Sequence, residues 1–280
     1  MTSAHFVARL VARRAATVAA LLVLTLLPAA SMAREGVEVG KNSVFTKFAS
    51  ANQVEQAATA QYQQLRQQAA AKSALGPDSD PQVVRLRAIA QKIIPFSYEW
   101  NPRAKDWNWE VNLLKSNQIN AFCMPGGKIA FYSGILDQLK LTDDEVAMVM
   151  GHEVAHALRE HARERMGKNA ATGMGANVLS QAFGLGNLGS QAMGMGAQLL
   201  TLKFGREDES EADLVGMELA ARAGYDPRAG VSLWQKMGAA SKGAPPQFMS
   251  THPSGPTRIA DIEKNLAKVM PLYLRAGGKK

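Results

Sequence analysis

Residues 152–156 read H-E-V-A-H, and this run limits the fold of the chain more than any other stretch. An α-helix turns by about 100° per residue, so His152 and His156 would project from the same face of a helix. Two imidazoles on one face can share a tetrahedral Zn²⁺, and Glu153 beside them can take a proton from zinc-bound water. The run therefore predicts two zinc ligands and a catalytic base. The alternative is a solvated helix face that matches the motif by chance.

The residues around this run predict the extent of its helix. Thr142 and Glu145 have the spacing of a capping box, in which each side chain binds the backbone of the other residue. Gly151 lowers the helix propensity, which indicates that close packing requires a glycine at this position. No proline interrupts the sequence that follows, so we expect the helix to continue through Arg165.

The first 33 residues have the pattern of a targeting segment. Three arginines precede an uncharged run at 15–33 that ends in Ser-Met-Ala, with small residues where a signal peptidase cleaves. We interpret residues 1–33 as a secretory signal peptide cleaved after Ala33, with an uncleaved membrane anchor as the alternative. No cysteine follows the apolar run, which argues against a lipoprotein anchor.

Charge and cysteine content narrow the class of the exported chain. Removal of the three arginines of the leader lowers the net charge from +8 to +5. A mildly basic exported protein can contact anionic envelope surfaces peripherally. Nucleic acid is not an expected partner, because no Lys/Arg-rich stretch with interleaved aromatic residues is present. Cys123 is the single cysteine, so an internal disulfide is impossible, and we expect it to pack in a strand rather than bind metal.

The hydrophobic pattern predicts an α+β fold that is mostly helical with a small β-sheet. The expected helices span 44–73, 82–94, 133–139, 206–223, 228–239 and a last segment from 257, and the expected strands span 107–114, 118–123 and 128–132. A Pro/Gly-rich loop is expected at 241–256. We divide the chain into the leader at 1–33, an N-terminal helical extension at 34–80 and a domain at 81–280.

Residues 169–202 carry no formal charge and are rich in Gly, Met and Ala. Their many polar and glycine residues argue against a membrane span, which needs about 20 predominantly apolar residues. We interpret the segment as a packed or mobile helical region near the metal site. An ordinary helical hairpin is the alternative.

The two histidines leave a zinc site short of a third protein ligand. On a continuous helix His161 lies about 140° from His156 and faces elsewhere, so we expect it at the surface or behind the ligands. The better source is R-E-D-E-S-E-A-D at 206–213. Glu209 is favoured there because Asp213, one turn later, can accept a proton from the distal nitrogen of a ligating histidine. The alternative is an ordinary acidic helix N-terminus, and Glu207 and Glu211 rank below Glu209.

Four segments in this order resemble one known family. H-E-V-A-H followed by E-S-E-A-D at 209–213 is similar to the gluzincin zinc endopeptidases that include HtpX and the CAAX prenyl proteases. The narrower resemblance is to the soluble periplasmic members of the BepA and LoiP type. N-A-F-C-M-P-G-G at 120–127 and T-H-P at 251–253, with Arg258 after it, resemble two further family segments.

The resemblance implies a zincin-like domain with its sheet above the motif helix. It implies one Zn²⁺ held by His152, His156 and Glu209, and a loop histidine, His252, that donates to the oxyanion. Arg258 would position His252 or a substrate carbonyl, although a surface charge is an equal alternative.

The resemblance also implies a function. Asn120 and Ala121 would present backbone groups to an extended substrate, as in β-strand addition. This favours a periplasmic endopeptidase for unfolded or misassembled envelope proteins. The alternative is an assembly factor or chaperone for outer-membrane proteins, in which the zinc site is latent. A degenerate site holding structural zinc is a third, weaker possibility.

Overall fold

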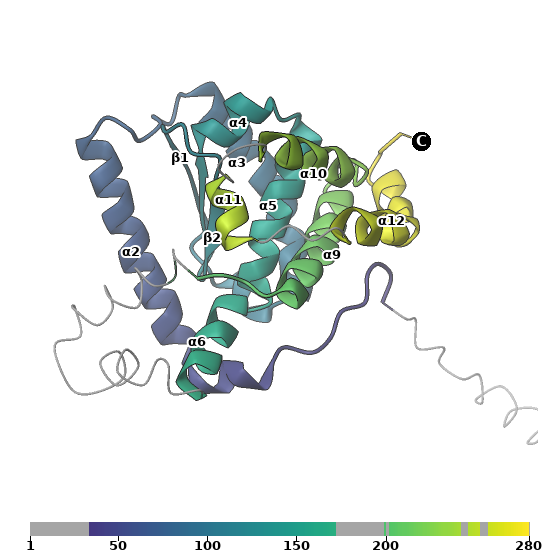
Figure 1. Ribbon diagram of the computed structural model, residues 1–280, viewed down its shortest axis with the longest axis horizontal. Helices are drawn as coiled ribbons and strands as arrows, with labels where there is room; N and C mark the ends of the chain where they lie inside the picture. Colours follow the sequence, from purple (N-terminus) through teal and green to yellow (C-terminus); the bar gives the residue numbers. More distant parts are fainter. Residues whose placement is uncertain (1–33, 172–198, 200–201, 242–245, 253–256, 280) are drawn as a thin grey trace, which may run out of the picture. The chain divides into compact units, whose positions relative to one another are not determined.

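The computed structural model describes residues 34–171, 199, 202–241, 246–252 and 257–279 (Figure 1). The helices and strands named below all lie within one compact unit, Gly36–Lys280. The expected signal peptide and almost all of the uncharged segment 169–202 fall outside the described residues. The division of the chain at residues 33 and 80 stays a prediction. Among the described helices, none is long and apolar enough to cross a membrane.

A three-stranded mixed sheet forms from β1 (Glu110–Leu114), β2 (Ala121–Met124) and β3 (Lys128–Tyr132). Its order is β1-β3-β2, with β1 parallel and β2 antiparallel to the central strand. The tight connection between β2 and β3 needs two glycines, because Gly126 and Gly127 adopt φ values of +84° and +76°. The order leaves β2 at an edge of the sheet.

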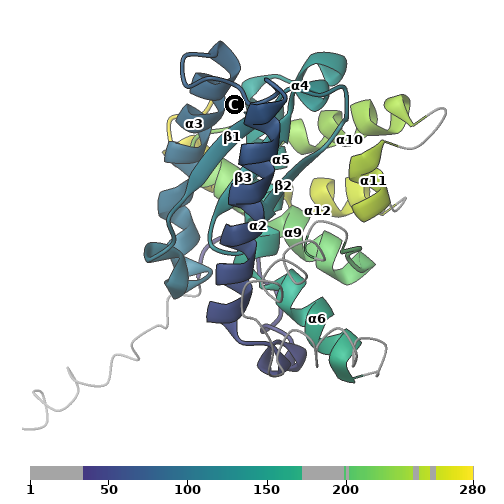
Figure 2. The same ribbon diagram turned by 90° about the vertical axis from the view of Figure 1, so that its left-hand side faces the viewer.

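Both faces of the sheet are covered by helices. Ile129 and Phe131 point into the main core, which α3 (Pro81–Ile93) and α5 (Asp143–Leu158) share. Ala130, between them in the strand, packs with Tyr62 of α2 (Ala51–Ala71) on the opposite face. Figure 2 shows α2 crossing in front of the strands. The sheet is thus fixed between α2 and the helix that carries the H-E-V-A-H run.

The other described helices complete the fold. They are the 3-10 helices η1 (Val44–Phe48), η2 (Ile94–Glu99) and η3 (Pro102–Lys105), and the α-helices α4 (Ser133–Leu139), α6 (His161–Ala171), α9 (Arg206–Arg222), α10 (Ala229–Ala240), α11 (Gln247–Thr251) and α12 (Arg258–Arg275). The mostly helical α+β architecture expected from the sequence is confirmed.

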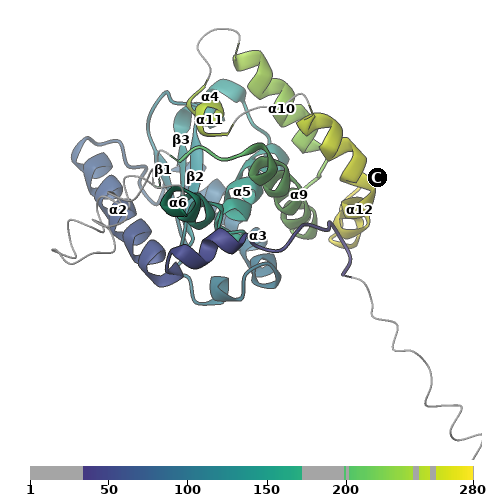
Figure 3. The ribbon, with the colours of Figure 1, turned by 60° about the horizontal axis from the view of Figure 1, so that its bottom comes forward.

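The helices α5 and α9 pack side by side (Figures 1 and 3). A Cβ atom on Gly151 would lie 2.5 Å from the carbonyl oxygen of Gly216, and one on Gly216 would lie 2.5 Å from the nitrogen of His152. Neither position can hold a side chain without moving a helix. The close packing expected at Gly151 is confirmed, and the structure shows that its partner is the backbone of Gly216.

The sequence suggested that the helix of the H-E-V-A-H run continues through Arg165, but in the structure it does not. It ends at Leu158, and α6 begins at His161. Glu160 between them has a φ of +58°. Asn101 donates to the carbonyl of Leu158 at 3.1 Å and so satisfies a group that the continued helix would have used.

Two further expectations need correction. The strand expected at 107–114 begins only at Glu110, because the backbone turns just before it, where the amide of Trp109 donates to the carbonyl of Trp107 at 3.1 Å. The two indoles bind outside the sheet, Trp107 to Glu55 and Trp109 to the carbonyl of Ala104, both at 3.0 Å. The loop expected at 241–256 contains a short helix, α11, which ends next to His252.

Candidate metal centre

The buried helix α5 positions the three residues of the motif. Its first turn is fixed by the expected capping box: Glu145 accepts from the backbone of Thr142 at 2.8 Å, and the Thr142 hydroxyl accepts in return at 3.3 Å. Two turns later the imidazoles of His152 and His156 stand together, with their Nε2 atoms 3.1 Å apart. The arrangement expected from the i, i+4 spacing is therefore present.

A buried cluster of four side chains forms around these two rings. Its potential ligand atoms all lie within 4.8 Å of one another, and they belong to His152, His156, Glu209 and His252. Glu209 comes from the first turn of α9, and its carboxylate oxygens lie 3.5 Å from Nε2 of each motif histidine. His252 follows α11, with Nδ1 3.0 Å from Glu209. Segments about 50 and 100 positions away in the sequence thus meet the motif helix.

The protonation states of His156 and Glu209 suit a zinc ion. Burial, followed by the neighbouring imidazole of His152, holds the pKa of His156 well below its usual range, so this ring is neutral. Burial acts to raise the pKa of Glu209, but the hydrogen bond with His252 and the nearby cations outweigh it and the pKa is lowered. A neutral imidazole and an ionised carboxylate are nitrogen and oxygen ligands that zinc takes in proteins.

A network of charged groups lies behind His152, and we call His152, Asp213 and Arg258 the Asp213 network. Nδ1 of His152 donates to Asp213 at 3.0 Å. Arg258 donates to both oxygens of Asp213, at 2.6 and 2.7 Å, and to Glu209 at 2.7 Å. Its guanidinium stacks on Trp234, 3.6 Å from the ring centre. Arg258 is thus buried against two carboxylates and is not a surface charge.

The charge of Arg258 has a clear effect on Asp213. Burial acts to raise the pKa of Asp213, but the guanidinium and the His152 hydrogen bond outweigh burial and lower this pKa to about 2. The carboxylate is therefore ionised and accepts from His152, as the E-S-E-A-D spacing had suggested. A hydrogen bond of this kind holds the proton of His152 on Nδ1 and leaves Nε2 free.

A second network lies behind His156 and includes His161. Of the two positions expected for His161, the structure shows the one behind the ligands and not the one at the surface. That ring is only 1% exposed. Its Nδ1 lies 2.9 Å from Nδ1 of His156, and its Nε2 lies 3.0 Å from Glu211, which also accepts from Arg159 at 2.7 Å. The angle of 140° assumed a continuous helix, whereas the break at Glu160 turns His161 towards the cluster. We call His156, His161, Glu211 and Arg159 the Glu211 network.

Glu153 occupies a different environment from the other carboxylates. Burial raises its pKa, although the neighbouring histidines partly oppose the shift. Its Oε1 atom is buried and makes no hydrogen bond with the described residues, and lies 3.5 Å from Nε2 of His252. A carboxylate with an unused oxygen and a raised pKa has the properties of a general base.

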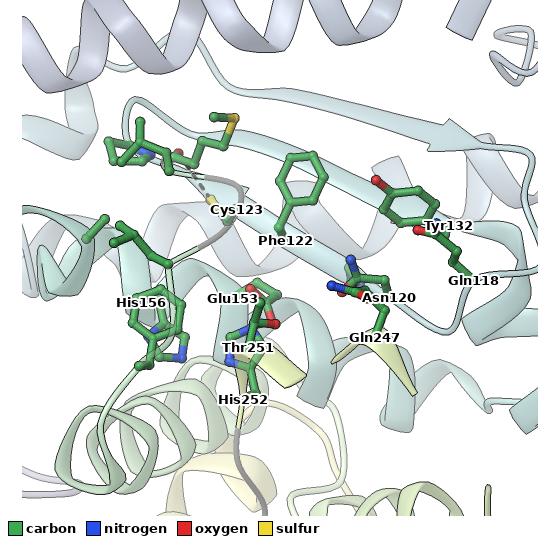
Figure 4. A pocket seen from close by; sticks show the side chains of 17 residues that line it. Gln118, Asn120, Phe122, Cys123, Tyr132, Glu153, His156, Gln247, Thr251 and His252 are labelled. Carbon is green, nitrogen blue, oxygen red and sulfur yellow. Dashed lines mark hydrogen bonds and ion pairs between the residues drawn. The ribbon is translucent and has the colours of Figure 1, made fainter. Parts of the chain in front are cut away.

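A cavity of about 300 Å³ opens in front of Glu153 (Figure 4). Its wall includes His156 and His252 on one side and residues of the edge strand β2 on the other. Asn120 and Ala121 line it, although the carbonyl of Asn120 already accepts from Tyr132 and the amide of Ala121 donates to the Asn120 side chain, both at 3.0 Å. Their binding of substrate stays a prediction.

Three further residues lie near the cavity or against its histidines. Cys123 is buried in β2, and burial raises the pKa of its thiol, as expected for a packing residue. Phe204 stacks on His156 and Phe248 on His252, with ring centres 4.0 and 4.5 Å apart. Sequence reasoning missed both phenylalanines, because neither belongs to a motif.

A buried histidine–carboxylate cluster, next to a glutamate of α5 whose Oε1 atom makes no hydrogen bond with the described residues, is the arrangement that the class of zinc-dependent peptidases uses. Comparison with known proteins agrees with this class. The model of peptidase family M48 matches residues 80–266, and the chain belongs to this family. Peptidases of this family use zinc, and the cluster described above is positioned to bind it.

Individual relatives cover different shares of the chain. Mitochondrial metalloendopeptidase OMA1 of Arabidopsis thaliana is 42% identical over 54% of this chain and 30% of its own length. Metalloprotease LoiP of Escherichia coli is 27% identical over 81% of this chain and 88% of its own length. The beta-barrel assembly-enhancing protease of Yersinia pestis is 29% identical over 57% and 35%. The chain therefore spans about a third of the Arabidopsis relative and most of the length of LoiP.

Proposed function

We propose that this protein is an exported zinc endopeptidase that hydrolyses peptide bonds in misfolded or misassembled envelope proteins. The observation that carries the proposal is the position of Glu153. Its Oε1 atom makes no hydrogen bond with the described residues, and Glu153 borders a cavity that His156 and His252 of the cluster and the edge strand β2 also line. A structural metal site has no use for such a base beside it.

The proposed roles follow from this arrangement. His152, His156 and Glu209 hold the zinc ion, and zinc bound there would act as a Lewis acid that acidifies water and polarises a carbonyl. Glu153 accepts the proton of the attacking water and passes it to the leaving amine. His252 donates to the oxyanion that forms on the scissile carbonyl. Burial of the cluster excludes bulk water and strengthens these electrostatic interactions.

The edge strand β2 supports the proposal of an extended substrate. A peptide strand added to a sheet edge is bound through main-chain hydrogen bonds, which tolerate many side chains. Asn120 and Ala121 are the proposed contact positions, at the start of β2 beside the cavity. Unfolded or misassembled proteins offer extended segments, whereas compact proteins do not.

The proposed compartment is the periplasm. Its support is the signal-peptide pattern at 1–33, with cleavage after Ala33, and the relatedness to LoiP and to the beta-barrel assembly-enhancing protease. The name of the latter makes outer-membrane assembly machinery a proposed partner. The mitochondrial OMA1 relatives show that the family is not confined to one compartment.

One observation favours a second candidate, an assembly factor whose zinc site is latent. Nδ1 of His252 lies 3.0 Å from Glu209 and 3.4 Å from Nε2 of His152, so His252 lies within the cluster. As a fourth ligand it would occupy the position that water needs. The same residue would then suppress cleavage instead of assisting it.

The proteolytic proposal is tested with Glu153→Gln. We expect cleavage of casein and of a misfolded porin to fall by about 10²- to 10⁴-fold, because the proton acceptor is lost. Zinc content should stay near one ion per chain, since Glu153 is not a proposed ligand. Glu263→Gln, at an exposed position on α12, is the matched control and should cleave normally. Undiminished cleavage by Glu153→Gln would contradict the mechanism.

His252→Ala separates the two candidates. Loss of an oxyanion donor should lower the cleavage rate by about 10²- to 10³-fold. If His252 instead blocks the site, its removal should raise the rate above that of the wild type. A rise would favour the assembly factor with a latent protease.

A further inference from the structure

We infer that His161 is a positioning residue that fixes the tautomer of His156 and directs its Nε2 atom into the metal cluster. The inference rests on the proposed function in one respect, which is that the cluster binds zinc. It does not depend on which substrate is cleaved or on whether the site is active.

The contacts of His161 form a continuous path from the cluster to a cation. Nδ1 of His161 lies 2.9 Å from Nδ1 of His156, on the side of that ring opposite to the cluster. Nε2 of His161 lies 3.0 Å from Oε2 of Glu211. The other oxygen of Glu211 accepts from Nε of Arg159 at 2.7 Å. Both nitrogens of His161 are therefore assigned to a single partner each.

The direction of donation follows from the end of this path. Glu211 can only accept, so Nε2 of His161 carries the proton that binds it. A neutral imidazole has one N–H, so Nδ1 of His161 must accept. The donor to it is Nδ1–H of His156, and the remaining nitrogen of His156, Nε2, has a free lone pair. That atom is the one that lies 3.5 Å from Glu209 in the cluster.

A second arrangement satisfies the same distances but cannot bind metal. If His161 were protonated on both nitrogens, it would donate to His156, whose own proton would then occupy Nε2. That proton would lie between the two motif histidines, whose Nε2 atoms are 3.1 Å apart. A zinc ion needs both lone pairs, so only the arrangement with neutral His161 is compatible with the proposed ligand set.

Further contacts in the fold hold this path in place. The bend at Glu160 places His161 in the first turn of α6, facing back towards the end of α5. Arg159 also donates to the carbonyl of Gly40, so the N-terminal segment helps to keep Arg159 against Glu211. Phe204 stacks on the face of His156 and limits rotation of the ring. His156 is thus supported on both its edge and its face.

The first test measures zinc affinity by competition with a chelator. His161→Phe fills the space of the ring but has no acceptor, and zinc should dissociate about 10- to 100-fold more readily. His161→Asn returns a carbonyl oxygen near the position of Nδ1 and should recover most of the affinity. Glu207→Gln, an exposed carboxylate on the same helix as Glu211, is the control and should bind zinc as the wild type does. Equal affinity in the Phe and Asn variants would overturn the inference.

A second variant covers the case in which His161→Phe does not fold. Glu211→Gln keeps the size of the side chain and weakens the acceptor that orients His161, so zinc affinity should fall by a smaller factor than in His161→Phe. Unchanged affinity in Glu211→Gln would then overturn the inference.

The tautomers themselves can be observed in the zinc-loaded wild-type protein. Nitrogen-15 NMR distinguishes protonated from metal-bound ring nitrogens, and we expect His156 to show a protonated Nδ1 and a ligating Nε2. A protonated Nδ1 on His161, or zinc on Nδ1 of His156, would refute the positioning role. Failure of the wild type to bind one zinc ion would instead refute the proposed function, so the two failures are distinguishable.

Discussion

The two motif histidines stand on one helix, but they are supported in different ways. His152 is held by the Asp213 network, in which a carboxylate binds the ring directly and a buried arginine binds the carboxylate. His156 is held by the Glu211 network, in which a second imidazole lies between the ring and the carboxylate. Both networks end on an arginine, and both carboxylates come from α9.

The two networks differ in how deeply their carboxylates are buried and in how many proposed zinc ligands they contact. The side chain of Asp213 is 6% exposed, whereas that of Glu211 is 23% exposed. Arg258 also binds Glu209, so the Asp213 network contacts a second proposed zinc ligand, while Glu211, His161 and Arg159 contact none besides His156. We therefore expect the Asp213 network to contribute more to folding stability, and the Glu211 network to act mainly on one ring.

The largest expected effect would separate the networks by stability. Arg258→Gln leaves the buried carboxylates of Glu209 and Asp213 without their cation and should lower the free energy of unfolding by about 3–5 kcal/mol. Arg159→Gln should cost about 1.5 kcal/mol, because Glu211 keeps His161 and is partly hydrated. Chemical denaturation of the two zinc-free variants measures both values. Equal losses would show that the networks do not differ as proposed.

The next effect concerns zinc affinity. Asp213→Asn keeps the shape of the side chain but removes the charge that favours donation by His152, and zinc affinity should fall by about 10- to 100-fold. The loss should exceed that of Glu211→Gln, because Asp213 contacts its ring without an intervening group. Chelator competition on both variants ranks them. If zinc affinity fell further in Glu211→Gln than in Asp213→Asn, the carboxylate that acts through His161 would matter more for zinc binding than the one that binds its ring directly.

The smallest effect uses a carboxylate outside both networks as a reference. Burial acts to raise the pKa of Glu145, but hydrogen bonds from Lys236, Thr142 and Ser232 outweigh it, and the pKa is lowered from 4.5. A lowered folded-state pKa gives stability that is present above the ordinary value and is lost as the pH falls below it.

Glu145→Gln should therefore flatten the loss of stability between about pH 5 and pH 3. Denaturation curves over this range check the expectation, with the exposed Glu263→Gln as the control. If the stability of Glu145→Gln fell with pH as steeply as that of the wild type, Glu145 would make no such contribution and could not serve as the reference.

Local signals in the sequence predicted much of this centre. Thr142 and Glu145 marked the start of α5, and the i, i+4 spacing placed His152 and His156 together, because capping and helix geometry act within a few residues. Glu209 and Asp213 were identified from one acidic turn and the family resemblance. The turn between β2 and β3 was also expected, because Met-Pro-Gly-Gly is typical of a tight turn.

The parts that were not predicted depend on contacts between distant residues. No glycine or proline marks the end of α5, and the bend at Glu160 is stabilised by Asn101, 57 positions before Leu158. The buried position of His161 follows from that bend and could not be derived from helix angles. The stacking of Phe204 on His156 likewise depends on the path of the chain into α9.

The contact between Gly151 and Gly216 has a consequence for protein engineering. Helix axes usually lie 8–10 Å apart at a contact, with a distance set by the side chains between them. Here the side chains are absent, and each backbone fills the space that a methyl group would need on the other. Grafting His152, His156 and Glu209 onto another helix pair would reproduce the ligands but not their separation. A transplanted centre would have to include the two glycines as well.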